Sequence, residues 1–130
     1  MTSQPTQPKN ILRTVVINLA RHNDRWEWVK ANFNAAGLNI ERLEAFDAKD
    51  PAAQPQIDAV VMPGAGLSRA EATCILSHRK AWQWLIESND DYIAVFEDDV
   101  HVAADMSSVL NTSNLQTGMD LVKLEIPTGK

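Results

Sequence analysis

Cysteine is nearly absent from this chain of 130 residues. The single Cys74 excludes an intramolecular disulfide framework and any zinc site built on several cysteines. Basic residues are also few, since 12 Lys and Arg stand against 17 Asp and Glu, and no Lys/Arg block is available to neutralise a nucleic-acid backbone. No apolar run approaches the roughly 20 residues of a membrane-spanning helix, and the polar N-terminus is no signal peptide. We therefore expect a soluble cytoplasmic protein that binds no nucleic acid.

The balance of residue types is that of a folded domain. Hydrophobic residues make up 45% of the chain and charged residues 22%, which is ordinary for a soluble globular protein. Residues 1–10 carry two prolines and small polar residues, so we expect a disordered lead. Residues 11–130 are then expected to form a single domain.

Hydrophobic spacing predicts alternating strands and helices. Short apolar runs predict strands over 14–19, 38–46, 92–96 and 121–124. Helical periodicity predicts helices over 24–36, 68–88 and 105–110, whereas the Pro- and Gly-bearing segment 47–66 is expected to be a loop. This alternation predicts an α/β fold with a mostly parallel sheet and helices on both faces.

The helix ends and faces lead to more specific expectations. Asp24 with Glu27, and Ser68 with Glu71, have the spacing of capping boxes, and Gly37 is suited to end the first helix. Trp26 and Trp82 fit the apolar stripes and are expected in the core. Trp28 and Trp84 are expected either to pack at a partner surface or to lie under a missing part of the protein. The buried stripe predicted for the second helix consists of Cys74, Ile75, His78, Ala81, Trp82 and Leu85.

The strongest chemical signal is Glu97-Asp98-Asp99, directly after a predicted strand. Ligands of open α/β sheets bind beyond the carboxyl ends of the strands. Adjacent carboxylates repel one another, and Mg²⁺ or Mn²⁺ relieves that repulsion because both ions prefer hard oxygen ligands. The triplet therefore predicts a metal site that holds a diphosphate, while a solvated acidic turn explains the same residues equally well.

Two further pairs of polar residues are each open to a functional or a purely structural interpretation. Glu71 and His78 lie two turns apart on one helix face, where they either border a site or are satisfied structural groups. Arg21 and Arg25 follow the first strand, where a helix start and guanidinium groups attract anions, although a solvated helix face is the alternative. No Gly-rich phosphate-binding motif is present.

Three blocks together resemble glycosyltransferase family 25. They are Val16-Ile17-Asn18-Leu19 with Arg21 and Arg25; Leu67 to Glu71 continued by Cys74 and Ser77 to Trp82; and Ile93 to Val100 with the acidic triplet. Phe46-Asp47-Ala48 is similar to a further segment of the family. The resemblance runs from about residue 14 to residue 124 and covers the N-terminal portion of the family's domain.

The resemblance implies a GT-A-like, Rossmann-type fold and a UDP-sugar donor. It implies an inverting transfer of a sugar, often galactose, to a glycan acceptor hydroxyl in lipopolysaccharide or lipooligosaccharide biosynthesis, assisted by Mn²⁺ or Mg²⁺. The metal residues implied are Glu97, Asp98 and Asp99; the residues at or near the donor are Asn18, Arg21, Arg25, Asp47, Ser68, Glu71 and His78. No residue is assigned as the catalytic base, which in such chemistry is a carboxylate.

Two other functions compete with this interpretation. One is a truncated, inactive module that binds a nucleotide sugar, because a site without its acceptor wall does not position the hydroxyl. The other is a different metal enzyme, a phosphatase or nuclease, which needs more carboxylates than the sequence brings together. A sheet edge left open would favour a homodimer, and peripheral contact with a membrane is compatible with the implied pathway.

Overall fold

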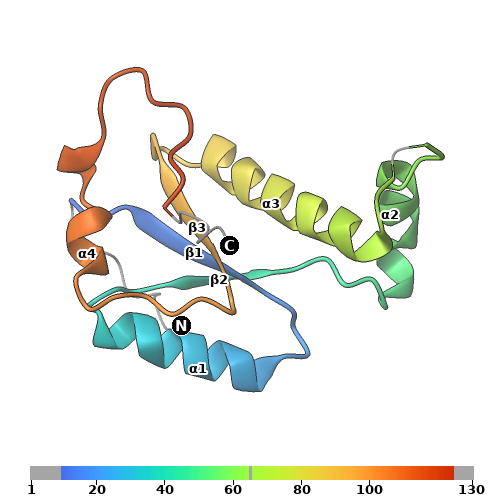
Figure 1. The fold of residues 1–130 in the computed structure, drawn as a ribbon, viewed down its shortest axis with the longest axis horizontal. Helices are drawn as coiled ribbons and strands as arrows, with labels where there is room; N and C mark the ends of the chain where they lie inside the picture. The colour runs from blue at the N-terminus through green and yellow to red at the C-terminus, as the bar shows by residue number, and fades with distance from the viewer. Residues whose placement is uncertain (1–9, 65, 125–130) are drawn as a thin grey trace, which may run out of the picture.

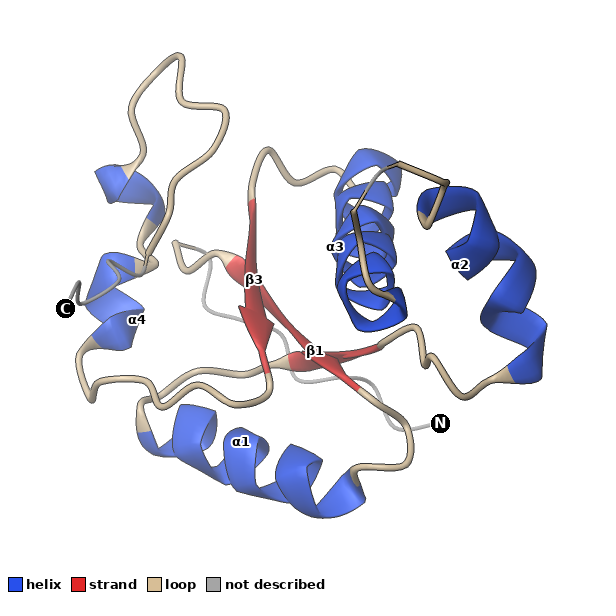
Figure 2. Ribbon diagram, turned by 45° about the vertical axis from the view of Figure 1, so that its right-hand side comes forward, coloured by secondary structure: helices blue, strands red, loops and turns tan. Residues whose placement is uncertain are grey.

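A parallel sheet forms the centre of the computed structural model, which describes residues 10–64 and 66–124. Its strands are β1 (Arg13–Asn18), β2 (Glu41–Glu44) and β3 (Ile93–Glu97), in the order β2-β1-β3. Helix α1 (Asn23–Ala35) covers one face and α3 (Arg69–Glu87) the other (Figures 1 and 2). The predicted α/β architecture is confirmed, and within the described residues all pairing between the strands is parallel.

Strand β1 is central because its side chains are apolar on both faces. Val16 packs with Val29 and Phe33 of α1, whereas Val15 and Ile17 pack on the opposite face with Ala81 of α3. All three β1 side chains are buried. Such two-sided burial is typical of strands in parallel sheets. Because β1 is the central strand, its end lies between the ends of β2 and β3.

Helix α1 ends as predicted but begins differently. Gly37 has φ +77°, and the amides of Gly37 and Leu38 donate to the carbonyls of Asn34 and Phe33, which is a Schellman motif. The proposed capping box of Asp24 and Glu27 is wrong. The chain turns at once after β1, since the His22 amide donates to the Leu19 carbonyl, and the helix begins at Asn23 without a side-chain cap.

Helix α3 has the predicted capping box at Ser68 and Glu71, but its buried face is not the predicted stripe. The prediction overlooked a short 3-10 helix η1 (Pro51–Ala53) and α2 (Gln54–Val60) in the expected loop. Ile57 of α2 packs against Ala72 and Leu76 of α3, so the face of α3 that is buried differs from the predicted one. The buried residues of α3 are Ala72, Thr73, Leu76, Ser77 and Ala81.

Three side chains of the predicted core are consequently placed elsewhere. Cys74 and Ile75 are exposed, and Trp82 is 54% exposed. Trp84 instead packs beside Ala81 against the sheet. On α1 the prediction holds, because Trp26 packs against the core and Trp28 is half exposed.

The segment after β3 contains the predicted short helix, α4 (Met106–Val109), followed by the 3-10 helix η2 (Thr112–Asn114). The strand expected over 121–124 is wrong, since these residues form no strand; a β-prone segment forms one only against a partner. Residues 1–9 of the expected disordered lead lie outside the described residues. No helix in the described parts combines the length and apolarity needed to cross a lipid bilayer.

Candidate functional site at the carboxyl edge of the sheet

The three parallel strands end at one edge of the sheet, and polar residues stand at each end. Asn18 ends β1 and pairs in register with Glu44, the last residue of β2. Ile17 pairs with Glu97, the last residue of β3. Ligands of open α/β sheets bind at this edge. The polar strand ends are therefore candidates for contact with a ligand.

Asn18 is the centre of a buried polar network. Its Nδ2 donates to Asp98 Oδ2 at 2.7 Å, and its Oδ1 accepts from Arg42 Nε at 2.8 Å and Nη2 at 2.5 Å. Only 1% of Asn18 is exposed. A guanidinium only donates and a carboxylate only accepts, so these partners fix the orientation of the amide. The Asn18 side chain at the end of β1 thus connects Arg42 of β2 with Asp98, which follows β3.

Arg42 of β2 is a member of this site that sequence analysis overlooked. Its Nη2 also donates to the carbonyls of Leu19 and Ala20, each at 3.3 Å. Its guanidinium lies over the ring of Trp26, 5.3 Å from the ring centre, a favourable cation–π distance. The one available signal was an arginine inside the apolar run that predicts a strand over 38–46, since a charge in a sheet needs partners where it is covered.

The three consecutive acidic residues at the end of β3, Glu97 to Asp99, differ in their surroundings. Asp98 is buried, accepts from Asn18, and lies 3.4 Å from Arg25 Nη1. Glu97 and Asp99 are exposed on either side of it. The Glu97 carboxylate lies 3.6 Å from His78 Nε2 of α3. Asp98 is thus engaged inside the protein, whereas the two flanking carboxylates, Glu97 beside His78 and Asp99, are exposed to solvent.

The predicted metal ligands can be compared with this geometry. Among residues 10–64 and 66–124, no three His, Cys, Asp or Glu side chains are grouped to hold a metal ion. Mg²⁺ and Mn²⁺ bound with phosphates often take only one or two protein carboxylates. The donor chemistry of exposed Glu97 and Asp99 fits that arrangement. Direct ligation by Asp98 stays a prediction, and its present hydrogen bonds would have to be exchanged.

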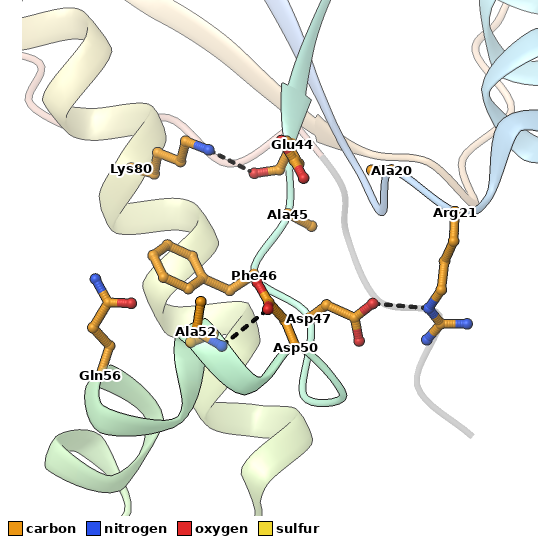
Figure 3. Close-up of a pocket in the computed structure, with 11 residues that line it drawn as sticks. Ala20, Arg21, Glu44, Ala45, Phe46, Asp47, Asp50, Ala52, Gln56 and Lys80 are labelled. Carbon is orange, nitrogen blue, oxygen red and sulfur yellow. Dashed lines mark hydrogen bonds and ion pairs between the residues drawn. The ribbon is translucent and has the colours of Figure 1, made fainter.

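A pocket of about 410 Å³ lies beside the network at the ends of β1 and β2. Figure 3 shows its wall, with Arg21 and Asp47 pointing toward each other. Arg21 Nε donates to Asp47 Oδ2 at 2.8 Å, and the Lys49 amide donates to the other oxygen of Asp47. Both hydrogen bonds lower the pKa of Asp47 from its ordinary value, and the bond from Arg21 makes the larger contribution.

The opposite wall of the pocket comes from α3 and the segment after β2. Lys80 Nζ donates to the Glu44 carbonyl at 3.0 Å (Figure 3). The Phe46 amide donates to Ser77 Oγ, and Ser77 in turn donates to the Thr73 carbonyl. Helix α3 is thereby fixed to the end of β2. The pocket has Lys80 of α3 on one side and Arg21 of the β1–α1 turn on the other.

The remaining predicted site residues lie at the start of α3. Ser68 and Glu71 cap one another, with both hydrogen bonds at 3.1 Å. The Ser68 amide, followed by its hydroxyl, lowers the pKa of Glu71. Burial, then the charges of Glu97 and Glu71, raises the pKa of the Cys74 thiol. Ser68 and Glu71 thus have a structural role at the start of α3, and neither of them lines the pocket.

Comparison with known proteins gives a consistent family. Residues 11–125 match the profile described as glycosyltransferase family 25 (LPS biosynthesis protein). A lacto-N-neotetraose biosynthesis glycosyltransferase, LgtE of Neisseria meningitidis serogroup B, is 32% identical over 100 residues, covering 73% of this chain and 35% of LgtE. LgtB of Neisseria gonorrhoeae, with the same description, is 34% identical over 90 residues, covering 65% and 31%.

The similarity extends to animals. A glycosyltransferase 25 family member of Anopheles gambiae is 26% identical over 105 residues, covering 74% of this chain and 18% of the mosquito protein. The chain thus spans about a third of the length of the two bacterial relatives.

Proposed function

The chain belongs to glycosyltransferase family 25, and we propose that it binds a UDP-sugar, UDP-galactose in the first instance, at the carboxyl edge of its sheet. The reaction proposed is transfer of the sugar to a glycan acceptor hydroxyl in cytoplasmic lipopolysaccharide or lipooligosaccharide synthesis. The observation that carries the proposal is the pocket between Arg21 and Lys80, next to the network centred on Asn18. The relatives with lacto-N-neotetraose in their names support the choice of a glycan acceptor.

The pocket has the features that recognise a nucleotide. Its volume of about 410 Å³ lies in the range of small-molecule sites. Arg21 and Lys80 supply positive charge for phosphates. Helix α1 begins at Asn23, two residues after Arg21, and the N-terminus of a helix also favours anions. Asp47 and Asp50 line the same pocket, and carboxylates accept hydrogen bonds from ribose hydroxyls. The pocket thus offers cations for the phosphates and carboxylates for the ribose hydroxyls.

The exposed carboxylates at the end of β3 are assigned to the diphosphate of the donor. Glu97 and Asp99 would hold Mg²⁺ or Mn²⁺, with the diphosphate as further ligands. When bound, the cation neutralises charge that develops on the departing diphosphate. Asp98, held by Asn18 and Arg25, keeps the segment in place. Proton removal from the acceptor hydroxyl is assigned to a carboxylate base that we do not place on this chain.

Calorimetric titration of the 130-residue chain with UDP and UDP-galactose, with and without Mn²⁺, tests the proposal. We expect binding at millimolar concentration or better, strengthened by the metal and weakened by Arg21→Ala and Asp99→Ala. Arg79→Ala is the matched control, because Arg79 is an exposed arginine that does not line the pocket. Absence of uridine-nucleotide binding to the unsubstituted chain, with metal present, would refute the proposal.

Turnover separates catalysis from binding alone. The second candidate function is donor binding without transfer, since no residue of the site is assigned as the catalytic base. Release of UDP from UDP-galactose, onto an acceptor or onto water, would identify catalysis. Metal-dependent binding without UDP release would instead identify a donor-binding module.

A further inference from the structure

Arg42 contacts three separate parts of the carboxyl edge, and none of the comparisons assigns it a role. We propose that Arg42 is a positioning residue of the donor site, holding the β1–α1 turn and the Asn18–Asp98 pair in the arrangement that the ligand requires. This inference rests on the proposed function for its effect on binding. Its structural part, the fixing of the turn, is testable without any ligand.

The first step is the turn itself. Arg42 Nη2 donates to the carbonyls of Leu19 and Ala20, which immediately precede Arg21. The next turn contact is the His22 amide, which donates to the Leu19 carbonyl at 2.9 Å. A guanidinium that satisfies two consecutive carbonyls fixes their peptide planes. Since Ala20 and Arg21 both line the pocket, Arg42 sets the position of that wall.

The second step passes through Asn18 to the acidic segment. Two nitrogens of Arg42 occupy Asn18 Oδ1, which turns the amide nitrogen toward Asp98. Asp98 and Asp99 form a turn after β3, in which Asp98 is buried while Asp99, like Glu97 at the end of β3, is exposed. Holding Asp98 inward therefore fixes the backbone that carries these two exposed carboxylates. Arg42 therefore acts on both the pocket wall and the proposed metal ligands.

Geometry, rather than charge alone, is what Arg42 supplies. Its Nε and Nη2 bind Asn18 while Nη2 also reaches the turn, and its plane lies over Trp26. A lysine ammonium is a compact point charge that reproduces neither the fork nor the flat stacking surface. Arg42→Lys therefore separates the positional role from a general electrostatic attraction of the donor.

The chain contains a matched control in Arg13, at the amino end of β1. Arg13 Nε donates to Glu41 at 2.6 Å, and its guanidinium lies over Trp84 at 5.5 Å. Both arginines thus combine a polar partner with a tryptophan ring. Arg13 does not line the pocket between Arg21 and Lys80. Substitution of Arg13 therefore measures the loss of stability that removal of such an arginine causes anywhere in the sheet.

The experiment compares Arg42→Lys and Arg42→Met with Arg13→Lys and Arg13→Met. UDP affinity with Mn²⁺ is measured by calorimetry, the melting temperature without ligand, and protection of the His22 amide by hydrogen exchange. We expect both Arg42 variants to lose UDP affinity by about tenfold or more, as is usual for groups that orient ligand-binding residues. The Arg13 variants should stay within about twofold of the unsubstituted chain, as for sites distant from the change.

Hydrogen exchange keeps the inference testable if no uridine nucleotide binds. We expect the His22 amide to exchange about tenfold faster in Arg42→Met than in Arg13→Met, since local opening of the turn costs less free energy. Equal exchange in the two variants would overturn the inference whatever the ligand result. Normal UDP affinity of Arg42→Lys would overturn it as well, because charge alone would then suffice.

Discussion

Asn18 and Asp98 are 80 positions apart in the chain, yet the amide of one donates to the carboxylate of the other at 2.7 Å in the interior. The bond joins the end of the central strand to the segment that follows β3. Its partners on either side are Arg42 and Arg25, so charges alternate along the network. This order makes the network sensitive to any change in the polarity of Asn18.

Asn18→Asp places a second carboxylate against Asp98 at nearly unchanged volume. We expect a loss of about 2–4 kcal/mol in the free energy of unfolding at neutral pH, because a buried hydrogen bond becomes a like-charge contact. Urea unfolding measures the loss. Asn34→Asp is the control, since Asn34 is an exposed residue of α1. A variant at position 18 as stable as this control would contradict the network.

Arg21 keeps the pKa of Asp47 below its ordinary value of 3.8. The folded-state pKa is the lower one, so the stabilisation is complete above about pH 3.8 and is lost as pH falls through the folded-state pKa. We expect Arg21→Met to raise the pKa of Asp47, seen by NMR in the titration of its carboxyl carbon. An unchanged titration in this variant would argue against the pair, whereas Arg79→Met should have no effect.

Ser68 and Glu71 cap α3, and this contact alone predicts a stability effect. We expect Ser68→Ala to lower the free energy of unfolding by about 1 kcal/mol, the usual value of an N-cap. Ser68→Asp should retain most of the stability, since aspartate also accepts from the helix amides. Because Ser68 does not line the pocket, UDP affinity should be unchanged. A selective loss of affinity would instead assign Ser68 to the donor site.

Cys74 lies at the surface with its thiol partly covered, and this partial burial, followed by the charges of Glu97 and Glu71, raises the pKa of the thiol. The thiolate is the reactive form, so alkylation at pH 8 should be slow. We expect Glu97→Gln to lower the pKa of Cys74 and to speed its reaction with iodoacetamide. Glu27→Gln, on α1, is the control. Equal rates in the two variants would show that Glu97 does not act on the thiol.

The parts of the fold that depend on local sequence were predictable. The apolar run at Val15 to Ile17 indicated a strand buried on both faces, and Gly37 and the Ser68 box indicated helix ends. Helix α2 was overlooked because Pro55 suggested a loop, although proline is tolerated in the first turn. Without α2, nothing in the spacing shows that α3 buries Leu76 and exposes Trp82.

The site was predictable in its residue types and not in its partnerships. The sequence places Asn18 and the acidic residues at strand ends, because parallel strands finish at one edge. It does not show that Asp98 points inward while its neighbours point outward, since that depends on an amide 80 positions away. Arg42 was overlooked for the same reason: its partners come from β1 and α1, and no local motif marks them.

The strand order β2-β1-β3 bears on how the protein is made. Strand β1 leaves the ribosome before β2 and β3, but the edge of β1 that pairs with β3 stays unpaired until residues 93–97 have been translated. Val15 and Val16 therefore lack the neighbouring strand β3 until that segment has been made, and unpaired apolar strand edges favour self-association. Chaperone dependence should accordingly be greatest just before β3 emerges and should fall once that segment is free to dock.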